Sequence, residues 1–131
     1  MNFKTSNHEK HYILWDEIVK KLQYFKDVGV SHLHEESIDL MKADICENHP
    51  NLGSPSHCYA CNEADRIQLE KKTHSADECV YCPINWGYDI GAEIDDCGDP
   101  ESIHRRLREK RYIDDSAIKL AIKIRDAEWR I

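Results

Sequence analysis

The cysteine residues carry the clearest chemical signal in this 131-residue sequence. Four of the six form two pairs, Cys58 with Cys61 and Cys79 with Cys82, in the pattern C-x2-C-x17-C-x2-C. A tight turn in each pair can bring both sulfurs to one side, each within about 2.3 Å of a shared ion. The spacing falls in the range of structural zinc sites. We therefore expect these four cysteines to bind one structural Zn²⁺ ion as thiolates.

Three other residues lie close enough in sequence to be additional or alternative ligands: His57, His74 and Cys97. Two other interpretations of the cysteines stay open. Six cysteines allow 15 disulfide pairings, although disulfide frameworks are typical of secreted chains. A C-x2-C redox motif would follow a strand in a βαβ pattern, which the sequence does not indicate. Zinc binding is the interpretation that the spacing favours.

A basic segment at residues 104–111 is the second feature that could do chemistry. Arg105, Arg106, Arg108 and Arg111 are candidate contacts to nucleic acid or to an acidic partner, because guanidinium groups bind phosphate and carboxylate in bidentate fashion. A zinc knuckle beside a basic helix is also a common nucleic-acid arrangement. The alternative is a solvated helix face.

The net charge of −7 is unevenly distributed along the chain. Residues 1–99 contain 9 Lys and Arg against 19 Asp and Glu, whereas residues 100–131 contain 9 against 6. An acidic protein is a poor non-specific binder of nucleic acid, because it repels the phosphate groups. This argument against nucleic-acid binding applies to the first three quarters of the chain. The sequence indicates an acidic body with a basic C-terminal segment.

An enzymatic activity is not expected. Four thiolates fill the coordination shell of zinc and leave no position for a reactive water. The enzyme that fits best is a His-Asn-His-type treble-clef nuclease, which also has paired C-x2-C motifs and needs one His as general base and another to hold a metal. His57, His74, Asn62 and Asn85 are present, but the His-rich strand and helix between the knuckles are not.

The spacing of apolar residues predicts a mainly α fold with little β-structure. A capping box of Ser6 and Glu9 predicts a first helix over about residues 7–27, with an apolar stripe that includes Leu14 and Ile18. Ser31 is expected to cap a second helix that ends near Cys46. Three further helices are expected over about residues 63–73, from Ser102, and from the cluster at residues 114–116 to the C-terminus.

These elements predict one domain over residues 1–131. It consists of an N-terminal antiparallel helical hairpin (1–48), a zinc-binding segment (49–99) and C-terminal helices (100–131). We expect the wide apolar face of the last helix to be buried, and the histidines at 8, 11, 32 and 34 to lie at the surface. Apolar runs of about four residues exclude a membrane span, which needs roughly 20. Charges at Lys10 and Asp16 interrupt the first apolar segment, so we expect no secretory signal and a cytoplasmic location.

The chain resembles small Cys-rich, zinc-binding proteins with paired C-x2-C motifs that are encoded by bacteriophages of Firmicutes. The resemblance covers most of the chain and is carried by Leu14-Trp-Asp16, Cys58-Tyr-Ala-Cys61, Cys79-Val-Tyr-Cys82-Pro-Ile-Asn-Trp86, Cys97 and the helix from Ala121 to Arg125. It implies zinc binding in the cytoplasm of the infected host and action on a host or defence protein. The expected function is protein–protein interaction, and nucleic-acid binding through residues 104–111 is the alternative.

Overall fold

The computed structural model describes residues 2–34, 36–52, 59–71 and 82–130, and these form a mainly helical fold. The predicted fold class is confirmed at that level. The described residues contain no strand, and their β-structure consists of two isolated bridges, His32 with Tyr112 and Ile84 with Trp129. The helices are α1 (Ser6–Asp27), α2 (Ser37–Asn48), α3 (Tyr59–Lys71), α4 (Ile103–Arg108) and α5 (Asp115–Arg125), with 3₁₀ turns η1 (Pro50–Leu52) and η3 (Tyr88–Ile90).

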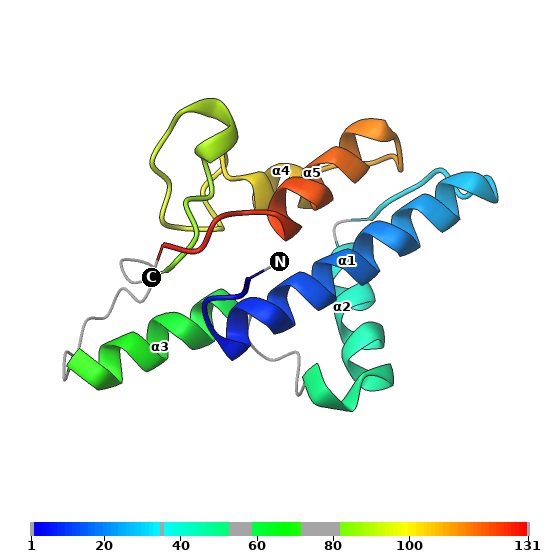
Figure 1. The fold of residues 1–131 in the computed structure, drawn as a ribbon. Helices are drawn as coiled ribbons and strands as arrows, with labels where there is room; N and C mark the ends of the chain where they lie inside the picture. The colour runs from blue at the N-terminus through cyan, green and yellow to red at the C-terminus, as the bar shows by residue number, and fades with distance from the viewer. Residues whose placement is uncertain (1, 35, 53–58, 72–81, 131) are drawn as a thin grey trace.

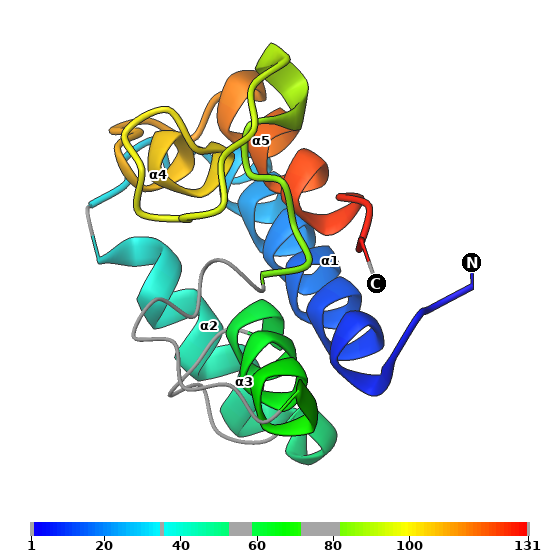
Figure 2. The same ribbon diagram turned by 90° about the vertical axis from the view of Figure 1, so that its left-hand side faces the viewer.

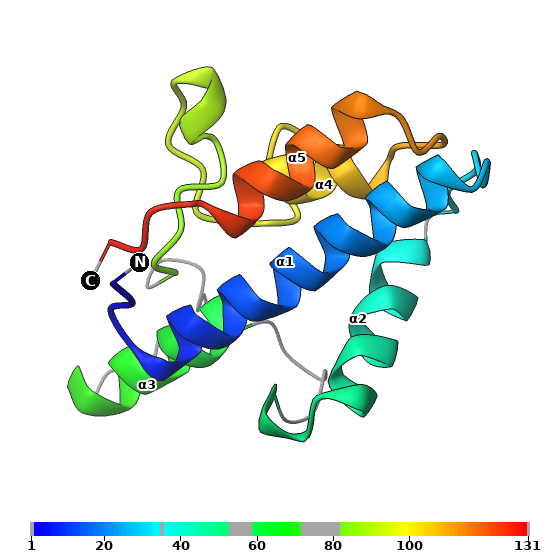
Figure 3. The same ribbon diagram turned by 45° about the vertical axis from the view of Figure 1, so that its right-hand side comes forward.

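Helix α1 is the central element of the fold. Figures 1 and 3 show it between α4 and α5 on one side and α2 and α3 on the other. Its packing is most extensive against α5 and then against α3. The predicted stripe is buried, with Ile18 and Leu22 fully inaccessible to solvent. The N-cap is Thr5, whose side chain accepts from the backbone N–H of His8, so the predicted capping box is wrong by one residue.

Helix α1 ends where the sequence indicates, at a glycine. The backbone N–H of Val30 donates to the carbonyl of Phe25, and that of Gly29 donates to Lys26. This is the Schellman pattern, which needs a left-handed residue between helix and exit. Gly29 has φ +87° and supplies it without the steric cost that a side chain would bring.

Helix α2 begins at Ser37, six residues later than the predicted start at Ser31. Residues 31–33 are instead paired with residues 111–113: the N–H of Leu33 donates to Arg111 and the N–H of Ile113 donates to Ser31. This pairing keeps the segment between α1 and α2 extended. The segment is therefore longer than the predicted antiparallel hairpin of the two helices requires. Helix α2 consequently crosses α1 at a steep angle in Figure 1 and does not lie along it.

Helix α3 begins at Tyr59, four residues earlier than predicted. Cys61 and Asn62 therefore lie in its first turn and not before it. Ala60 and Ala64 are buried against the rest of the core. The helix is also attached through its one buried carboxylate, Glu63, which accepts from the Asn7 side chain of α1.

Helix α5 ends at Arg125 and does not continue to the C-terminus as predicted. Residues after it run beside residues 83–84: Trp129 pairs with Ile84, and the N–H of Arg130 donates to the carbonyl of Pro83. Trp129 is completely buried by this contact. The expected burial of the apolar face is confirmed, because Ala117, Ala121 and Ile124 are all inaccessible to solvent.

A single cluster of buried side chains contains residues of all five helices and of the loop between residues 84 and 94. Helices α4 and α5 pack on each other as well as on α1. Within the part of the chain that is described, no helix is long and apolar enough to cross a membrane.

Candidate functional site

Two of the four predicted zinc ligands lie in described segments that approach one another. Cys61 is in the first turn of α3, and Cys82 is the first described residue of the segment that leads to the Ile84–Trp129 bridge. Figures 1 and 2 both show the start of that segment beside the N-terminal end of α3. Both cysteines are half-buried, and Cys82 packs against the core. The predicted zinc site would take two ligands from each segment.

The other predicted ligands are placed differently. Cys58, Cys79, His57 and His74 lie outside the described residues. Cys97 is half-buried and packs against the core, and its carbonyl accepts a 2.6 Å hydrogen bond from Ser102. Across the described ranges, no group of three or more Cys, His, Asp or Glu side chains is arranged to hold a metal ion. The four-cysteine zinc site stays a prediction.

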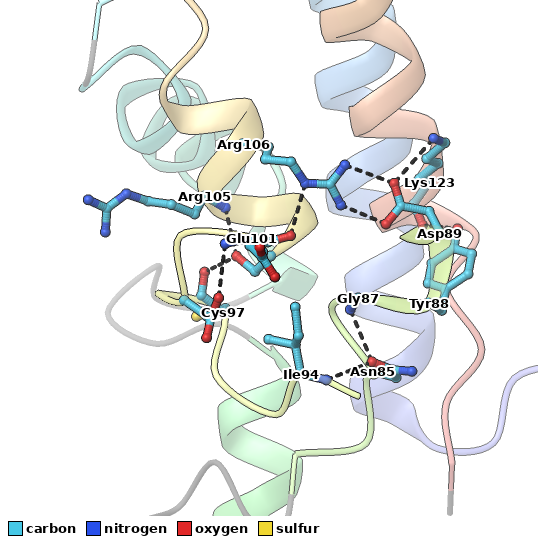
Figure 4. A network of polar contacts seen from close by, with 12 residues as sticks. Asn85, Gly87, Tyr88, Asp89, Ile94, Cys97, Glu101, Arg105, Arg106 and Lys123 are labelled. Carbon is cyan, nitrogen blue, oxygen red and sulfur yellow. Dashed lines mark hydrogen bonds and ion pairs between the residues drawn. The ribbon is translucent and has the colours of Figure 1, made fainter. Parts of the chain in front are cut away.

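The segment after Cys82 forms a closed loop that supports α4. The side-chain oxygen of Asn85 accepts from the backbone N–H groups of Gly87 and Ile94, at 3.0 Å each (Figure 4). A side chain at Gly87 would place its Cβ 2.9 Å from the carbonyl oxygen of Ala92, which explains the glycine. The Asn85 amide therefore has a structural role.

An ion cluster attaches this loop to both C-terminal helices. The Asp89 carboxylate accepts two hydrogen bonds from the Arg106 guanidinium, at 2.6 and 2.9 Å, and lies 3.3 Å from the Lys123 ammonium (Figure 4). Only 5% of the Asp89 side chain is exposed. Hydrogen bonds from Arg106, more than from Lys123, lower the pKa of Asp89. Asp89 thus joins the loop to α4 through Arg106 and to α5 through Lys123. The Arg106 guanidinium is therefore already hydrogen-bonded within the protein.

Helix α4 is short because Ser102 caps its N-terminus and Glu109 caps its C-terminus, only seven residues later. Ser102 is fully buried, and its hydroxyl accepts from the backbone N–H of Arg105. The helix ends where the N–H of Glu109 donates to Arg105 and the N–H of Lys110 donates to Leu107. Ile103 and Leu107 face the core, whereas Arg105 is exposed, so the helix has one buried and one solvated face.

The remaining three arginines of the basic segment gather around a hollow. Arg105, Arg108, Glu109 and Arg111 line a surface cavity of about 380 Å³, which we call the arginine hollow. Residues 105, 108 and 109 share a side of the helix because they are three and four positions apart. The structure therefore brings together three of the four arginines that the sequence singles out and separates Arg106 from them.

The guanidinium groups of the arginine hollow use only some of their N–H donors in hydrogen bonds within the described residues. Arg105 donates to the Glu109 carboxylate at 2.8 Å and to the Gly98 carbonyl at 3.2 Å. Arg108 donates to Asp39 at 3.1 Å, while its Nε is buried and has no hydrogen-bond partner within the described part of the chain. Arg111 makes a long 3.5 Å contact to the Glu109 carbonyl. The exposed guanidinium groups of Arg105 and Arg111 keep donors that an incoming anion can satisfy.

The prediction that His8 and His11 lie at the surface is wrong, because both are buried, and His104 takes part in packing as well. His8 and His11 are buried against Trp129, and His11 shares a 2.8 Å hydrogen bond with the carbonyl of Ile124. His104 is half-buried between Trp15 and Trp86, with its Nε2 3.1 Å from the Lys42 ammonium. The sequence does contain a signal for this burial. His11 lies three and four positions before Leu14 and Trp15, and His8 lies three before His11, so both histidines fall on the apolar stripe of α1. His32 and His34 are exposed, as predicted.

Burial of these imidazoles makes the fold sensitive to acid. Burial lowers the pKa of His11 to about 4, so the unfolded chain takes up a proton near pH 6.5 that the folded protein refuses until about pH 4. Stability is therefore complete above pH 6.5 and falls as the pH drops through that window, by about 3 kcal/mol for this residue. Urea titrations at pH 7 and 4.5 measure the loss. We expect His11→Gln to reduce the pH dependence and to leave the part that His104, whose pKa is lowered by burial to about 3, contributes, whereas His34→Gln leaves it unchanged; equal slopes in all three proteins would contradict the assignment.

Comparison of the chain with protein-family models, with curated proteins and with solved structures finds no match.

Proposed function

We propose that this protein is a small zinc-stabilised binding protein that recognises an acidic segment of a partner protein at the arginine hollow. The observation that carries the proposal is the convergence of Arg105, Arg108 and Arg111 on one cavity of about 380 Å³. Guanidinium groups offer paired donors to carboxylates, and such charge-assisted bonds are about twice as strong as neutral ones. The resemblance to bacteriophage proteins supports a host or defence protein in the host cytoplasm as the partner.

The charge around the arginine hollow favours a protein over a nucleic acid. Glu109 lines the hollow and Asp39 pairs with Arg108 beside it, so a continuous phosphate backbone would meet two carboxylates. Non-specific nucleic-acid binding depends on Lys and Arg side chains that neutralise several phosphates in a row, whereas this cavity offers three arginines. Residues 1–99 add 19 acidic side chains against 9 basic ones. A few carboxylates on a short segment match this site better.

Zinc has a structural role in the proposal. Cys58, Cys61, Cys79 and Cys82 are the proposed ligands, and four thiolates leave the ion no open position for chemistry. The ion would join α3 to the segment that begins at Cys82. That segment continues into the Asn85 loop and the Asp89 cluster, which in turn hold α4 and its arginines. Zinc thereby positions the binding site from a distance.

A charge reversal at the arginine hollow tests the function. We expect wild-type protein to bind a short synthetic Glu-rich peptide, and Arg105→Glu or Arg111→Glu to weaken that binding about tenfold, which corresponds to the loss of one charge-assisted contact. Isothermal titration calorimetry at low and physiological salt measures the affinities. Circular dichroism checks that each variant is folded.

A matched control separates the site from overall charge. Lys119→Glu makes the same charge change at an exposed position of α5 and should leave the affinity within about twofold. Equal losses in Lys119→Glu and Arg105→Glu would mean that only net charge matters. Tighter binding of a DNA or RNA duplex than of the Glu-rich peptide, lost in Arg105→Glu, would replace the proposal with its nucleic-acid alternative.

A further inference from the structure

One acidic residue lies among the arginines of the arginine hollow. Glu109 lines the same cavity as Arg105, Arg108 and Arg111, and its Oε1 accepts a 2.8 Å hydrogen bond from Nε of Arg105. Its backbone carbonyl also receives the 3.5 Å contact from Arg111. A carboxylate of the protein itself therefore already occupies part of the surface that a carboxylate of the partner would bind.

The position of Glu109 in α4 gives its carboxylate no favourable role in the helix. Glu109 is the C-cap residue, where the partial negative charge of the helix C-terminus disfavours an acidic side chain. In the ion pair of the two residues, Arg105 precedes Glu109 by four positions, which is the weaker order for such a pair on a helix. The contact with Arg105 therefore places a negative charge in the hollow at little benefit to the helix.

The contact between Glu109 and Arg105 can be exchanged for a contact with a ligand. It consists of one hydrogen bond, and 55% of the Glu109 side chain and 44% of the Arg105 side chain are exposed. Exposed ion pairs of this kind contribute little, because water screens both charges. The pair of Asp89 with Arg106 differs, since it has two hydrogen bonds and its carboxylate is almost completely buried. The Glu109 pair can therefore open at low cost while the Asp89 pair stays closed.

A ligand carboxylate that binds the Nε side of Arg105 has to displace Glu109. Carboxylates bind guanidinium groups most strongly through two parallel N–H groups, and on this side one of the two is the Nε group. Nε is the donor that Glu109 uses. The Nη1 group of Arg105 already donates to the carbonyl of Gly98 at 3.2 Å. Exchange of Glu109 for the ligand keeps the Nε donor paired with a carboxylate throughout.

We propose that Glu109 is an internal competitor of the ligand: its carboxylate occupies Arg105 in the free protein and is exchanged for a carboxylate of the partner on binding. The inference rests on the proposed function and adds a residue that sets the affinity of the same site. It implies that the partner presents several carboxylates. A single carboxylate gains no more at Arg105 than Glu109 already provides, whereas further ones can bind Arg108 and Arg111.

Titration of four proteins with the Glu-rich peptide tests the competition: the wild type, Glu109→Gln, Arg105→Gln and the double variant Arg105→Gln/Glu109→Gln. We expect Glu109→Gln to bind the peptide about threefold to fivefold more tightly than the wild type, as the release of one exposed ion pair predicts. In the Arg105→Gln background the same substitution should change the affinity by less than about 1.5-fold, because the bond that it removes is already absent. Isothermal titration calorimetry at physiological salt measures the affinities, and circular dichroism checks that each variant is folded.

Glu128→Gln is the matched control, because it removes the same charge from an exposed residue outside the lining of the hollow. It should leave the affinity within about 1.5-fold of the wild type, since salt screens a distant charge. An equal gain in Glu128→Gln and Glu109→Gln would overturn the competition and assign the effect to overall charge. A gain from Glu109→Gln that persists in the Arg105→Gln background would overturn it as well.

The results also separate this inference from the proposed function. Binding of the peptide by the wild type, with no gain in Glu109→Gln, overturns the role of Glu109 and leaves the arginine hollow intact. No binding by any of the four proteins overturns both.

Discussion

Removal of zinc is expected to unfold the protein or to leave only a marginally stable remnant. Structural zinc sites contribute about 10–16 kcal/mol of apparent free energy in zinc-finger peptides, which matches the roughly 5–15 kcal/mol that stabilises a whole domain. The described contacts of α3 include Ala60 and Ala64 in the core, the hydrogen bond from Asn7 to Glu63, and the Tyr59 hydroxyl, which donates to the Leu52 carbonyl at 2.7 Å. A zinc ion bound by the four cysteines as proposed would add far more free energy than any one of these contacts.

Circular dichroism during thermal unfolding, with and without a strong chelator, measures this effect. Elemental analysis in parallel should find one zinc per chain in the wild-type protein and none in Cys61→Ser or Cys82→Ser. Cys46→Ala is the matched control, because Cys46 is buried at 3.7 Å from the Tyr59 hydroxyl and is not a proposed ligand. It should keep its zinc and lose only about 1 kcal/mol, as is typical of a small core truncation. An unchanged melting curve after chelation would contradict the zinc site.

Asp89→Asn is expected to cost about 2–3 kcal/mol of unfolding free energy. The substitution leaves the Arg106 guanidinium and the Lys123 ammonium facing each other without the carboxylate between them. Breaking a buried pair by removal of one partner costs about 3–5 kcal/mol. The value here lies below that range because 29% of the Arg106 side chain and 43% of the Lys123 side chain are exposed, so water screens them.

Urea denaturation of Asp89→Asn beside Glu93→Gln measures this cost against a solvated pair. The Glu93 side chain is 75% exposed in its 2.8 Å pair with Arg130, so its loss should cost less than about 1 kcal/mol. Asp89→Asn should also weaken binding of the Glu-rich peptide, since α4 loses its attachment to the loop. Equal stabilities of the two variants would show that the Asp89 cluster is no more than a surface ion pair.

The elements that local interactions determine could be predicted from the sequence. Ser102 and Asp114 each cap a helix through a hydrogen bond to a backbone N–H three residues later, so the starts of α4 and α5 depend on neighbouring residues alone. Ser31 is an equally good cap by composition, but its carbonyl is used by Ile113, far along the chain. Long-range pairing of this kind overrides a local signal and moved the start of α2.

The candidate site could be predicted only in part for the same reason. A run of basic residues identifies the arginines but not which of them are available to a ligand. Arg106 differs from Arg105 because Asp89, 17 residues earlier in the chain, reaches it across the fold. The backbone of Arg111 is held by the N–H of Leu33, which donates to its carbonyl from 78 positions earlier in the chain. The burial of His11 likewise depends on the C-terminal segment, which folds back onto α1.

The most direct measurement of the binding function is a charge swap. The double variant Arg105→Glu/Arg111→Glu and the wild-type protein are each titrated with a Glu-rich peptide and with its Lys-rich counterpart at the same salt concentration. Recognition by the arginine hollow predicts that the wild-type protein prefers the Glu-rich peptide and that the double variant prefers the Lys-rich one. Failure of the wild-type protein to bind the Glu-rich peptide, or retention of that binding by the double variant, would contradict it.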